Sequence, residues 1–303
     1  MNTLFVLLGP TAVGKTELSL QLAERLDCPI LSADSRQMFR DIPIGTAAPT
    51  QAEQQRVPHH FVGTLGLEDY YSAAQYEQEA LALAQRLFQE HASLVVSGGS
   101  MMYIDALCQG IDDIPTITPE VRAAVLARYE REGLSPLLAD LIRWDPDYAA
   151  IVDPHNHKRI VHALEVITQT GQTLTSFRQG RKKERPFRIV KIGLNRPRPE
   201  LFERINQRTT LMVEQGFVDE ARRVLPYRHC NSLNTVGFKE MFQHLDGKWA
   251  LDFTLDRIRK NTRVYAKKQL TWFQKDSSIT WFHPCDIAAV QDHVTAHLSL
   301  SHP

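Results

Sequence analysis

The sequence predicts an α/β fold in which helices flank a parallel sheet and a helical insertion interrupts the core. Short apolar runs alternate with helical patterns over residues 3–96, and this alternation is typical of a parallel sheet. From Thr118 the pattern changes to helical pieces broken by prolines, and an apolar run returns at Phe187. We therefore expect a core formed by residues 1–111 and 186–303, with residues 112–185 as the insertion.

Each expected core element has its own residue pattern. Residues 3–8 form an apolar run that ends in glycine, and the helical pattern of residues 17–26 repeats leucine every fourth position. Residues 29–33 start with a proline, which a strand tolerates at its first position. The same reasoning gives a helix at 72–90, strands at 93–96, 187–194 and 279–282, and helical patterns at 200–225 and 252–273.

The composition is that of an ordinary globular protein. Of the 303 residues, 43% are hydrophobic and 23% charged, which excludes disordered, collagen-like and disulfide-scaffold classes. The four cysteines lie far apart without a CxxC pair, which argues against a zinc site and indicates a reducing compartment. No apolar stretch approaches the roughly 18 residues of a membrane span, and the first apolar run is too short for a signal peptide. We expect a cytoplasmic protein without a membrane partner.

Charge is distributed unevenly along the chain. Lys plus Arg equals Asp plus Glu, at 35 each, but between Arg178 and Arg208 eleven bases face three acids. A second basic stretch, Arg257–Lys275, holds seven bases and no acid. Such stretches favour a surface that faces a polyanion, although an ordinary solvated helix face has the same composition.

A phosphate-binding motif follows the first expected strand. The residues fit GxxxxGK[ST], in which glycines let the backbone curl so that successive N–H groups point at phosphate oxygens. The lysine adds a positive charge, the threonine hydroxyl can hold Mg²⁺, and the next helix presents its positive N-terminus. The motif predicts a phosphorylated substrate and a P-loop NTPase-like sheet, and its residues are Gly9, Pro10, Thr11, Ala12, Val13, Gly14, Lys15 and Thr16.

The motif alone does not decide the chemistry. Kinases and NTPases with this loop need an acid at a strand end to hold Mg²⁺, but the strand at 93–96 runs into Ser97–Ser100 without an acid. The acid at a strand end is Asp34, which we expect to face the phosphate loop because ligands bind beyond the carboxyl ends of parallel strands. An aspartate that follows a strand is also a common helix cap, and this alternative stays open.

Six blocks of the sequence occur in one order along nearly the whole chain: Gly9–Thr16, Asp34–Gln37, Gly98–Tyr103, Arg159–Val166, Val236–Glu240 and Tyr265–Phe273. Together they resemble the tRNA dimethylallyltransferase family, in the bacterial form that lacks a zinc-finger extension. The chain departs from the family pattern at a few positions: the family usually has Thr where this chain has Ser100, Gly-Leu in place of Met101-Met102, Arg in place of His162 and Tyr in place of Phe238.

The resemblance implies transfer of a dimethylallyl group from dimethylallyl diphosphate to N6 of adenosine 37 in tRNA, with release of diphosphate. It implies that Lys15, Arg208 and Thr16 with Mg²⁺ hold the leaving group. Asp34 would accept the N6 proton, and Ser100 would position Asp34 or the amine. Two alternatives on the same scaffold are a small-molecule or nucleoside kinase and a non-catalytic RNA-binding NTPase.

The resemblance also implies how tRNA is bound. The adenine must leave the stacked anticodon loop to be alkylated, and the helical insertion is expected to contact the tRNA. The protein is expected to act as a monomer. The implied tRNA-binding residues are Asp34, Ser35, Arg36, Gln37, Ser100, Lys158, Arg159, Ile160, Val161, His162 and Lys239.

Overall fold

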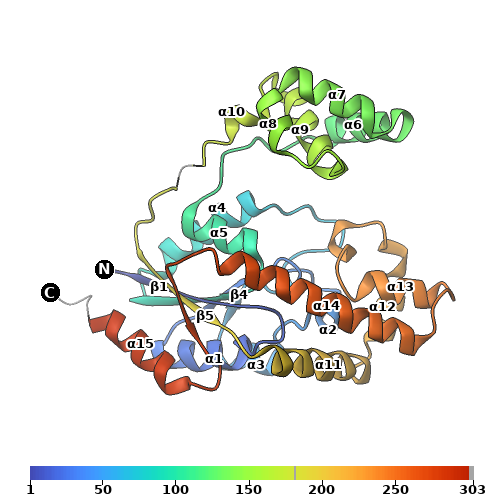
Figure 1. Cartoon of the computed structure of the whole chain (residues 1–303). Helices are drawn as coiled ribbons and strands as arrows, with labels where there is room; N and C mark the ends of the chain where they lie inside the picture. The colour runs from blue at the N-terminus through green and yellow to red at the C-terminus, as the bar shows by residue number, and fades with distance from the viewer. Residues whose placement is uncertain (181, 300–303) are drawn as a thin grey trace. The chain divides into compact units, whose positions relative to one another are not determined.

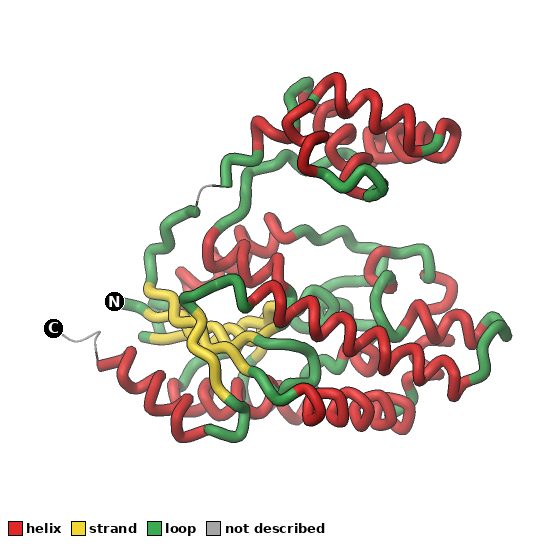
Figure 2. The backbone as a smooth tube through the Cα atoms, viewed as in Figure 1, coloured by secondary structure: helices red, strands yellow, loops and turns green. Residues whose placement is uncertain are grey.

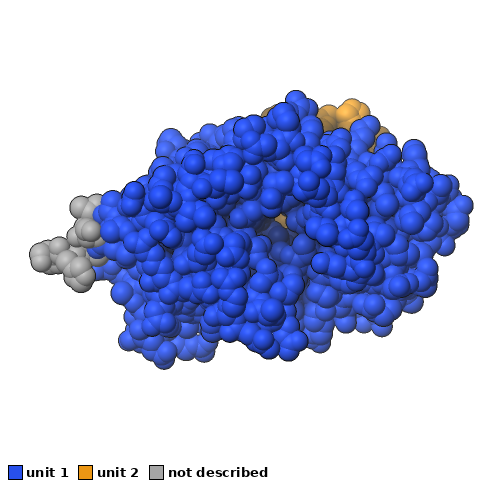
Figure 3. Space-filling model, turned by 90° about the horizontal axis from the view of Figure 1, so that it is seen from below, with its two compact units in different colours: residues 1–108, 185–303 blue, residues 109–184 orange. Residues whose placement is uncertain are grey.

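The chain forms two compact units. Residues 1–108 and 185–303 form unit 1, and residues 109–184 form unit 2 (Figure 3). The computed structural model describes residues 1–180 and 182–299, so Arg181 of the first basic stretch lies outside the described residues. Strands occur only in unit 1 of this described part, whereas unit 2 consists of helices and loops (Figure 2).

A six-stranded parallel sheet is the centre of unit 1. Its strand order is β3-β2-β4-β1-β5-β6, and every neighbouring pair is parallel. The prediction of a parallel α/β sheet of the P-loop NTPase-like kind is confirmed. The strands are β1 (Thr3–Leu8), β2 (Ile30–Ala33), β3 (His59–His60), β4 (Ser93–Gly98), β5 (Arg188–Leu194) and β6 (Ile279–Phe282).

The register brings three loops to one edge of the sheet. Leu8 at the end of β1 pairs with Gly98 of β4 and with Gly193 of β5. Ala33 at the end of β2 also pairs with Gly98, and a Cβ on Gly98 would collide with the Ala33 carbonyl. The phosphate loop, the loop after β2 and the loop after β4 therefore start side by side, although they are far apart in sequence.

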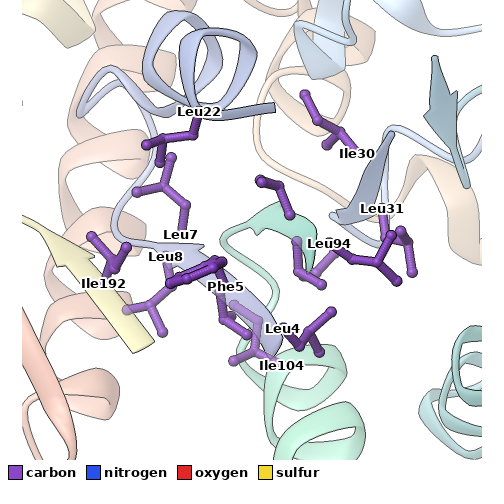
Figure 4. Close-up of a cluster of buried hydrophobic side chains, with 14 of the residues drawn as sticks. Leu4, Phe5, Leu7, Leu8, Leu22, Ile30, Leu31, Leu94, Ile104 and Ile192 are labelled. Atoms are coloured by element: carbon purple, nitrogen blue, oxygen red, sulfur yellow. The ribbon is translucent and has the colours of Figure 1, made fainter. Parts of the chain in front are cut away.

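Helices cover both faces of this sheet. In Figure 1, α1 and α15 lie on one face and α4 and α5 on the other. Side chains of β1 alternate between the faces, with Leu7 directed toward Leu22 of α1 and Leu4 toward Ile104 of α5 (Figure 4). Because both faces are covered, all six residues of β1 are buried. The helices named here are α1 (Lys15–Leu26), α4 (Ala73–Leu87), α5 (Met101–Gln109) and α15 (Ile287–Ser299).

The other helices of unit 1 bring together a second hydrophobic cluster, which includes Phe217, Phe238 and Ile258. The helical pattern predicted over 200–225 corresponds to two helices, because Gly216 takes the left-handed conformation (φ 97°) and ends the first. These elements are α2 (Pro43–Thr46), α3 (Gln51–Arg56), α11 (Arg198–Glu214), α12 (Phe217–Val224), α13 (Phe238–Leu245) and α14 (Leu251–Phe273), with 3₁₀ turns at Leu225–Tyr227 and Asn231–Leu233.

Unit 2 is a small helical bundle with its own core. Asp145 is buried, and its carboxylate accepts bonds from the Tyr148 N–H (3.2 Å) and from the Thr175 hydroxyl (2.6 Å) and N–H (2.9 Å). It thus caps one helix and ties it to the start of another. The helices are α6 (Pro119–Glu132), α7 (Leu134–Trp144), α8 (Pro146–Ile151), α9 (His157–Thr170) and α10 (Leu174–Phe177).

Within the described residues, none of the helices has the length and apolar character needed to cross a bilayer. All four cysteines are free thiols, and three of them, Cys28, Cys108 and Cys230, are buried. Burial raises the pKa of Cys28 and of Cys108 to about 12, so these thiols stay protonated near neutral pH.

Candidate active site

A cavity of about 620 Å³ lies in unit 1, whose surface is hollowed near the middle of the face in Figure 3. The phosphate loop contributes Thr11 and Lys15 to its wall, and the loop after β2 contributes Asp34. Arg208 of α11 and Tyr265 of α14 also line it. Two substrates that react with each other could therefore share this space.

The phosphate loop adopts the curled backbone that the motif predicts. Gly9, Ala12 and Gly14 have φ values of 154°, 64° and 109°. A Cβ on Gly9 would lie 2.6 Å from the Leu194 carbonyl oxygen, so the loop passes too close to β5 for a side chain at this position. Helix α1 begins at Lys15, directly after the loop, and its N-terminal N–H groups favour an anion there.

The Lys15 side chain is bound to backbone carbonyls of the phosphate loop. Its Nζ donates to the Gly9 carbonyl (3.0 Å) and to the Pro10 carbonyl (2.9 Å). Burial lowers the pKa of Lys15 to about 8, and the negative charge of Asp34 opposes that shift while the positive charge of Arg208 adds to it. The ammonium is thus a poorly hydrated cation, and an anion that enters the loop would stabilise its charged form.

Three arginines hold successive residues of the loop. Arg196 Nε donates to the Val13 carbonyl (2.8 Å), and Arg204 Nε donates to the Ala12 carbonyl (2.8 Å). Arg208 Nη1 donates to the Thr11 hydroxyl (2.9 Å). Arg204 and Arg208 lie on one face of α11 because they are four residues apart. Burial lowers the pKa of Arg208, again opposed by Asp34, but a guanidinium keeps its charge at neutral pH.

Asp34 is both a turn cap and a free acceptor. Its Oδ1 accepts the N–H of Arg36 (2.9 Å) and, at 3.4 Å, that of Gln37. Among the described residues, the other carboxylate oxygen has no hydrogen-bond partner, and Asp34 lines the cavity. The cap fixes the orientation of the carboxylate and leaves one oxygen free to take a proton.

The neighbours of Asp34 mainly hold its loop. Ser100 is buried, accepts the Ser35 N–H (2.8 Å) and shares a hydrogen bond with the Ser35 hydroxyl (3.1 Å). Arg36 Nη1 donates to the Asn231 carbonyl (2.7 Å), and Gln37 Nε2 donates to the Ala47 carbonyl (2.9 Å). The cavity wall includes Ser35, Arg36 and Gln37 but not Ser100. Ser100 therefore contacts the turn that carries Asp34 and does not line the cavity.

Comparisons with known proteins identify the family. The profile described as IPP transferase matches residues 37–276. The chain is 60% identical over 284 residues to the tRNA dimethylallyltransferase 1 of Bacteroides thetaiotaomicron, covering 94% of this chain and 92% of that protein. It is 54% identical over 298 residues to the tRNA dimethylallyltransferase 2 of Parabacteroides distasonis, covering 98% and 100%.

The chain belongs to the tRNA dimethylallyltransferase family.

Solved structures agree with this assignment. The full-length tRNA isopentenylpyrophosphate transferase of Bacillus halodurans superposes with a TM-score of 0.73 at 32% identity, with all of both chains covered. A eukaryotic dimethylallyltransferase described as acting on tRNA gives a TM-score of 0.76 at 25% identity, covering 90% of this chain and 70% of that one. The resemblance found in the sequence is confirmed, and so is the enzyme class.

The remaining tRNA candidates of this family member lie in both units. Lys239, near the start of α13, is exposed and lines the cavity. In unit 2, Lys158 and Arg159 are exposed on α9, whereas Ile160 and Val161 lie in the hydrophobic core. Those two side chains pack inside the bundle, because they lie on the apolar face that an amphipathic helix directs toward the core. His162 is half-buried, and its Nδ1 lies 3.3 Å from the Glu165 carboxylate.

Two residues of α14 line the cavity although the sequence did not predict them as site residues. Tyr265 lines the cavity, and burial together with the Asp34 charge raises its pKa to about 12. Gln269 is buried and also borders the cavity. The two are four residues apart, so helical spacing could have placed them on one face. The sequence places both residues in the second basic stretch and in the block Tyr265–Phe273, and assigns neither a role. Two aromatic residues of that block have other contacts: Phe273 is buried, and Trp272 donates to Asp105 (2.8 Å).

The donor set at the cavity suits a hard cation that takes other ligands from its substrate. No cluster of three or more His, Cys, Asp or Glu able to hold a metal exists among the described residues. The cavity wall does include Thr16, whose hydroxyl is an oxygen donor. Mg²⁺ usually keeps several waters and takes few protein ligands besides substrate phosphates, and the Thr16 hydroxyl next to the phosphate loop fits this.

Proposed function

We propose that this chain transfers a dimethylallyl group from dimethylallyl diphosphate to N6 of adenosine 37 in tRNA, forming N6-(dimethylallyl)adenosine and diphosphate. The observation that carries this proposal is the pairing of two chemical functions in one cavity. The phosphate loop, with the half-buried cations Lys15 and Arg208, faces Asp34, whose carboxylate has a free oxygen. The family membership of the chain supports the same activity.

The loop side of the cavity supports departure of the diphosphate. Its N–H groups and the N-terminus of α1 would bind the phosphate oxygens, and Lys15 would exchange two carbonyl partners for phosphate oxygens. Arg208, held at Thr11, would stabilise the charge that grows as the carbon–oxygen bond breaks. Thr16 would hold Mg²⁺, which, when bound, neutralises charge on the diphosphate.

Asp34 fits the base that takes the N6 proton. The bond from N6 to the allylic carbon forms as the bond from that carbon to the diphosphate oxygen breaks. The proton leaves N6 for the free oxygen of Asp34 while Oδ1 stays bound to the turn. Ser100 would be a positioning residue in this reaction, since it holds the same turn through Ser35.

Binding of tRNA would use residues of both units. Arg36, Gln37 and Lys239 line the cavity and would contact the adenine and its neighbours after the base has turned out of the loop. On α9, residues 158–162 offer Lys158, Arg159 and His162 to tRNA, so residues 112–185 would act as a tRNA-binding insertion. One chain carries all of these residues, and we propose that it acts as a monomer.

The test of the activity is incubation of the purified protein with radiolabelled dimethylallyl diphosphate and bulk tRNA, followed by nucleoside analysis. We expect label in N6-(dimethylallyl)adenosine, with its formation dependent on Mg²⁺. ATP is offered in parallel, because the same loop occurs in kinases. Hydrolysis of ATP at a rate that rivals transfer, with allylic diphosphate failing to compete, would overturn the proposal in favour of a kinase or NTPase.

The tRNA-binding role of α9 is tested by salt dependence. Replacing Lys158 and Arg159 together with alanine should flatten the slope of log affinity against log salt by up to about two units, if each contacts a phosphate. Affinity for dimethylallyl diphosphate should not change, because both residues are outside the unit that contains the cavity. Equal slopes in variant and parent would remove α9 from the tRNA interface.

A further inference from the structure

The amide of Gln269 joins two loops that the reaction uses. Gln269 lies on α14 and is 2% exposed. Its Oε1 accepts the Thr11 N–H of the phosphate loop at 2.9 Å, and its Nε2 donates to the Gly99 carbonyl after β4 at 2.7 Å. A buried amide is costly unless its polar atoms are paired, so the side chain and both loops hold one another in place.

The link continues from Gly99 to the proton acceptor. Ser100, the next residue, donates its N–H to the Ala33 carbonyl (3.1 Å) and accepts the Ser35 N–H (2.8 Å). These bonds hold the residues on either side of Asp34. A continuous series of hydrogen bonds therefore runs from the phosphate loop, through Gln269, to the turn that carries Asp34.

The absence of a side chain at Gly99 makes this contact possible. A Cβ on Gly99 would lie 2.6 Å from Gln269 Nε2 and 3.2 Å from the Gly9 carbonyl oxygen. The phosphate loop, the loop after β4 and the Gln269 amide thus meet without spare space. A small displacement of any one of them moves the others.

We infer that Gln269 is a positioning residue for the transfer reaction, which sets the phosphate loop and the Asp34 turn at the separation the reaction needs. The leaving diphosphate is bound at one end of this link and the N6 proton is accepted at the other. A misplacement of about 1 Å in such a geometry can cost on the order of a hundredfold in rate. The inference rests on the proposed function of the cavity.

Two substitutions separate positioning from simple packing. Gln269→Met has a similar volume and makes neither hydrogen bond, so it should lower the single-turnover rate by about 10- to 100-fold at saturating tRNA and dimethylallyl diphosphate. Gln269→Glu keeps an acceptor for the Thr11 N–H but, when ionised, places an oxygen without a proton against the Gly99 carbonyl. Burial raises the pKa of such a carboxyl, so lowering the pH restores a donor.

The pH profile is the decisive measurement. We expect the ratio of the Gln269→Glu rate to the parent rate to rise as the pH falls from about 8.5 to about 6, because the carboxyl regains its proton. Titration of groups remote from residue 269 cancels in the ratio. Lys15 Nζ lies near Gly99 and its charge opposes the effect of burial, so the profile is repeated in the Lys15→Arg background, whose guanidinium stays charged over this range. Gln274→Glu, one residue beyond the end of α14 and exposed, is the matched control, and its ratio should stay near one.

Three results decide the inference. Parent-like rates in both Gln269 variants, or losses that match only the folded fraction measured by thermal unfolding, would overturn it. A Gln269→Glu ratio that does not change with pH would also overturn it, and this test stands even where Gln269→Met does not fold. Failure of the parent to transfer the dimethylallyl group would instead overturn the proposed function, so the two failures are distinguishable.

Discussion

Replacing Asp34 with asparagine should stop catalysis while keeping the fold. In the parent, Oδ1 accepts the N–H groups of Arg36 and Gln37, and an asparagine Oδ1 can accept both. The oxygen that faces the cavity becomes an amide nitrogen, which cannot accept the N6 proton. We expect turnover to fall by about 10²- to 10⁴-fold, or about 3 to 5 kcal/mol of transition-state stabilisation.

The stability of the same variant should change little. Because the turn keeps its cap, we expect the free energy of unfolding to stay within about 0.5 kcal/mol of the parent. Asp34→Ala removes the cap as well as the base, and should cost an additional 0.5 to 2 kcal/mol, roughly, in stability. Comparing the two variants by thermal unfolding separates the cap from the base.

The assay needs a controlled pH. The Asp34 charge raises the pKa of Lys15 against the larger effect of burial, so Asp34→Asn lowers the pKa of Lys15 further. Single-turnover rates at about pH 6.5, with both substrates saturating, keep Lys15 protonated and isolate the loss of the base. An Asp34→Asn rate within about threefold of the parent would refute the role of Asp34 as the proton acceptor.

Three further predictions follow from the structure. Lys15, with a pKa of about 8, is charged below that pH and loses its charge above it, whereas an arginine at this position stays charged. Calorimetry should therefore show the affinity of the parent for inorganic diphosphate falling, relative to that of Lys15→Arg, by up to about tenfold for each pH unit above 8; equal pH profiles would contradict this. Gly9→Ala would place Cβ 2.6 Å from the Leu194 carbonyl oxygen, so diphosphate affinity should drop at least about tenfold, and parent-like binding would contradict the close approach. Arg185 donates to Glu77 (2.7 Å), and both side chains are under a tenth exposed; Arg185→Met should destabilise unit 1 by about 3 to 5 kcal/mol in urea unfolding, and a loss below about 1 kcal/mol would count against the buried charge.

Local patterns were sufficient for the elements and for part of the site. Residues 3–8 form a continuous apolar run, which indicates a strand covered on both faces, and β1 is buried throughout. The GxxxxGK[ST] spacing specifies a curled loop because glycine tolerates positive φ, and Gly9 and Gly14 have it. The sequence also placed Asp34 at a strand end, and the structure shows it at the cavity.

Two further features of the fold have local signals in the sequence, namely the buried side chains of α9 and the end of α11. Ile160 and Val161 belong to a helical pattern whose apolar positions form the core of unit 2. The family resemblance implies tRNA binding for all of residues 158–162, although the helical periodicity separates the buried side chains from Lys158 and Arg159. Gly216 indicates where α11 ends, because glycine readily takes the left-handed conformation, which does not continue an α-helix.

By itself, the sequence determined the class of sheet, the phosphate loop and the family of this protein, because these depend on residues that are neighbours in the chain. Only the tertiary structure decided which distant side chains bind the backbone of that loop. Arg196 and Arg204 reach it from 183 and 192 residues away, and Gln269 from 258. Strand order and helix packing bring these groups together, and neither is encoded by the spacing of residues close in the sequence. The contacts form, and stabilise the loop, only once the core has folded.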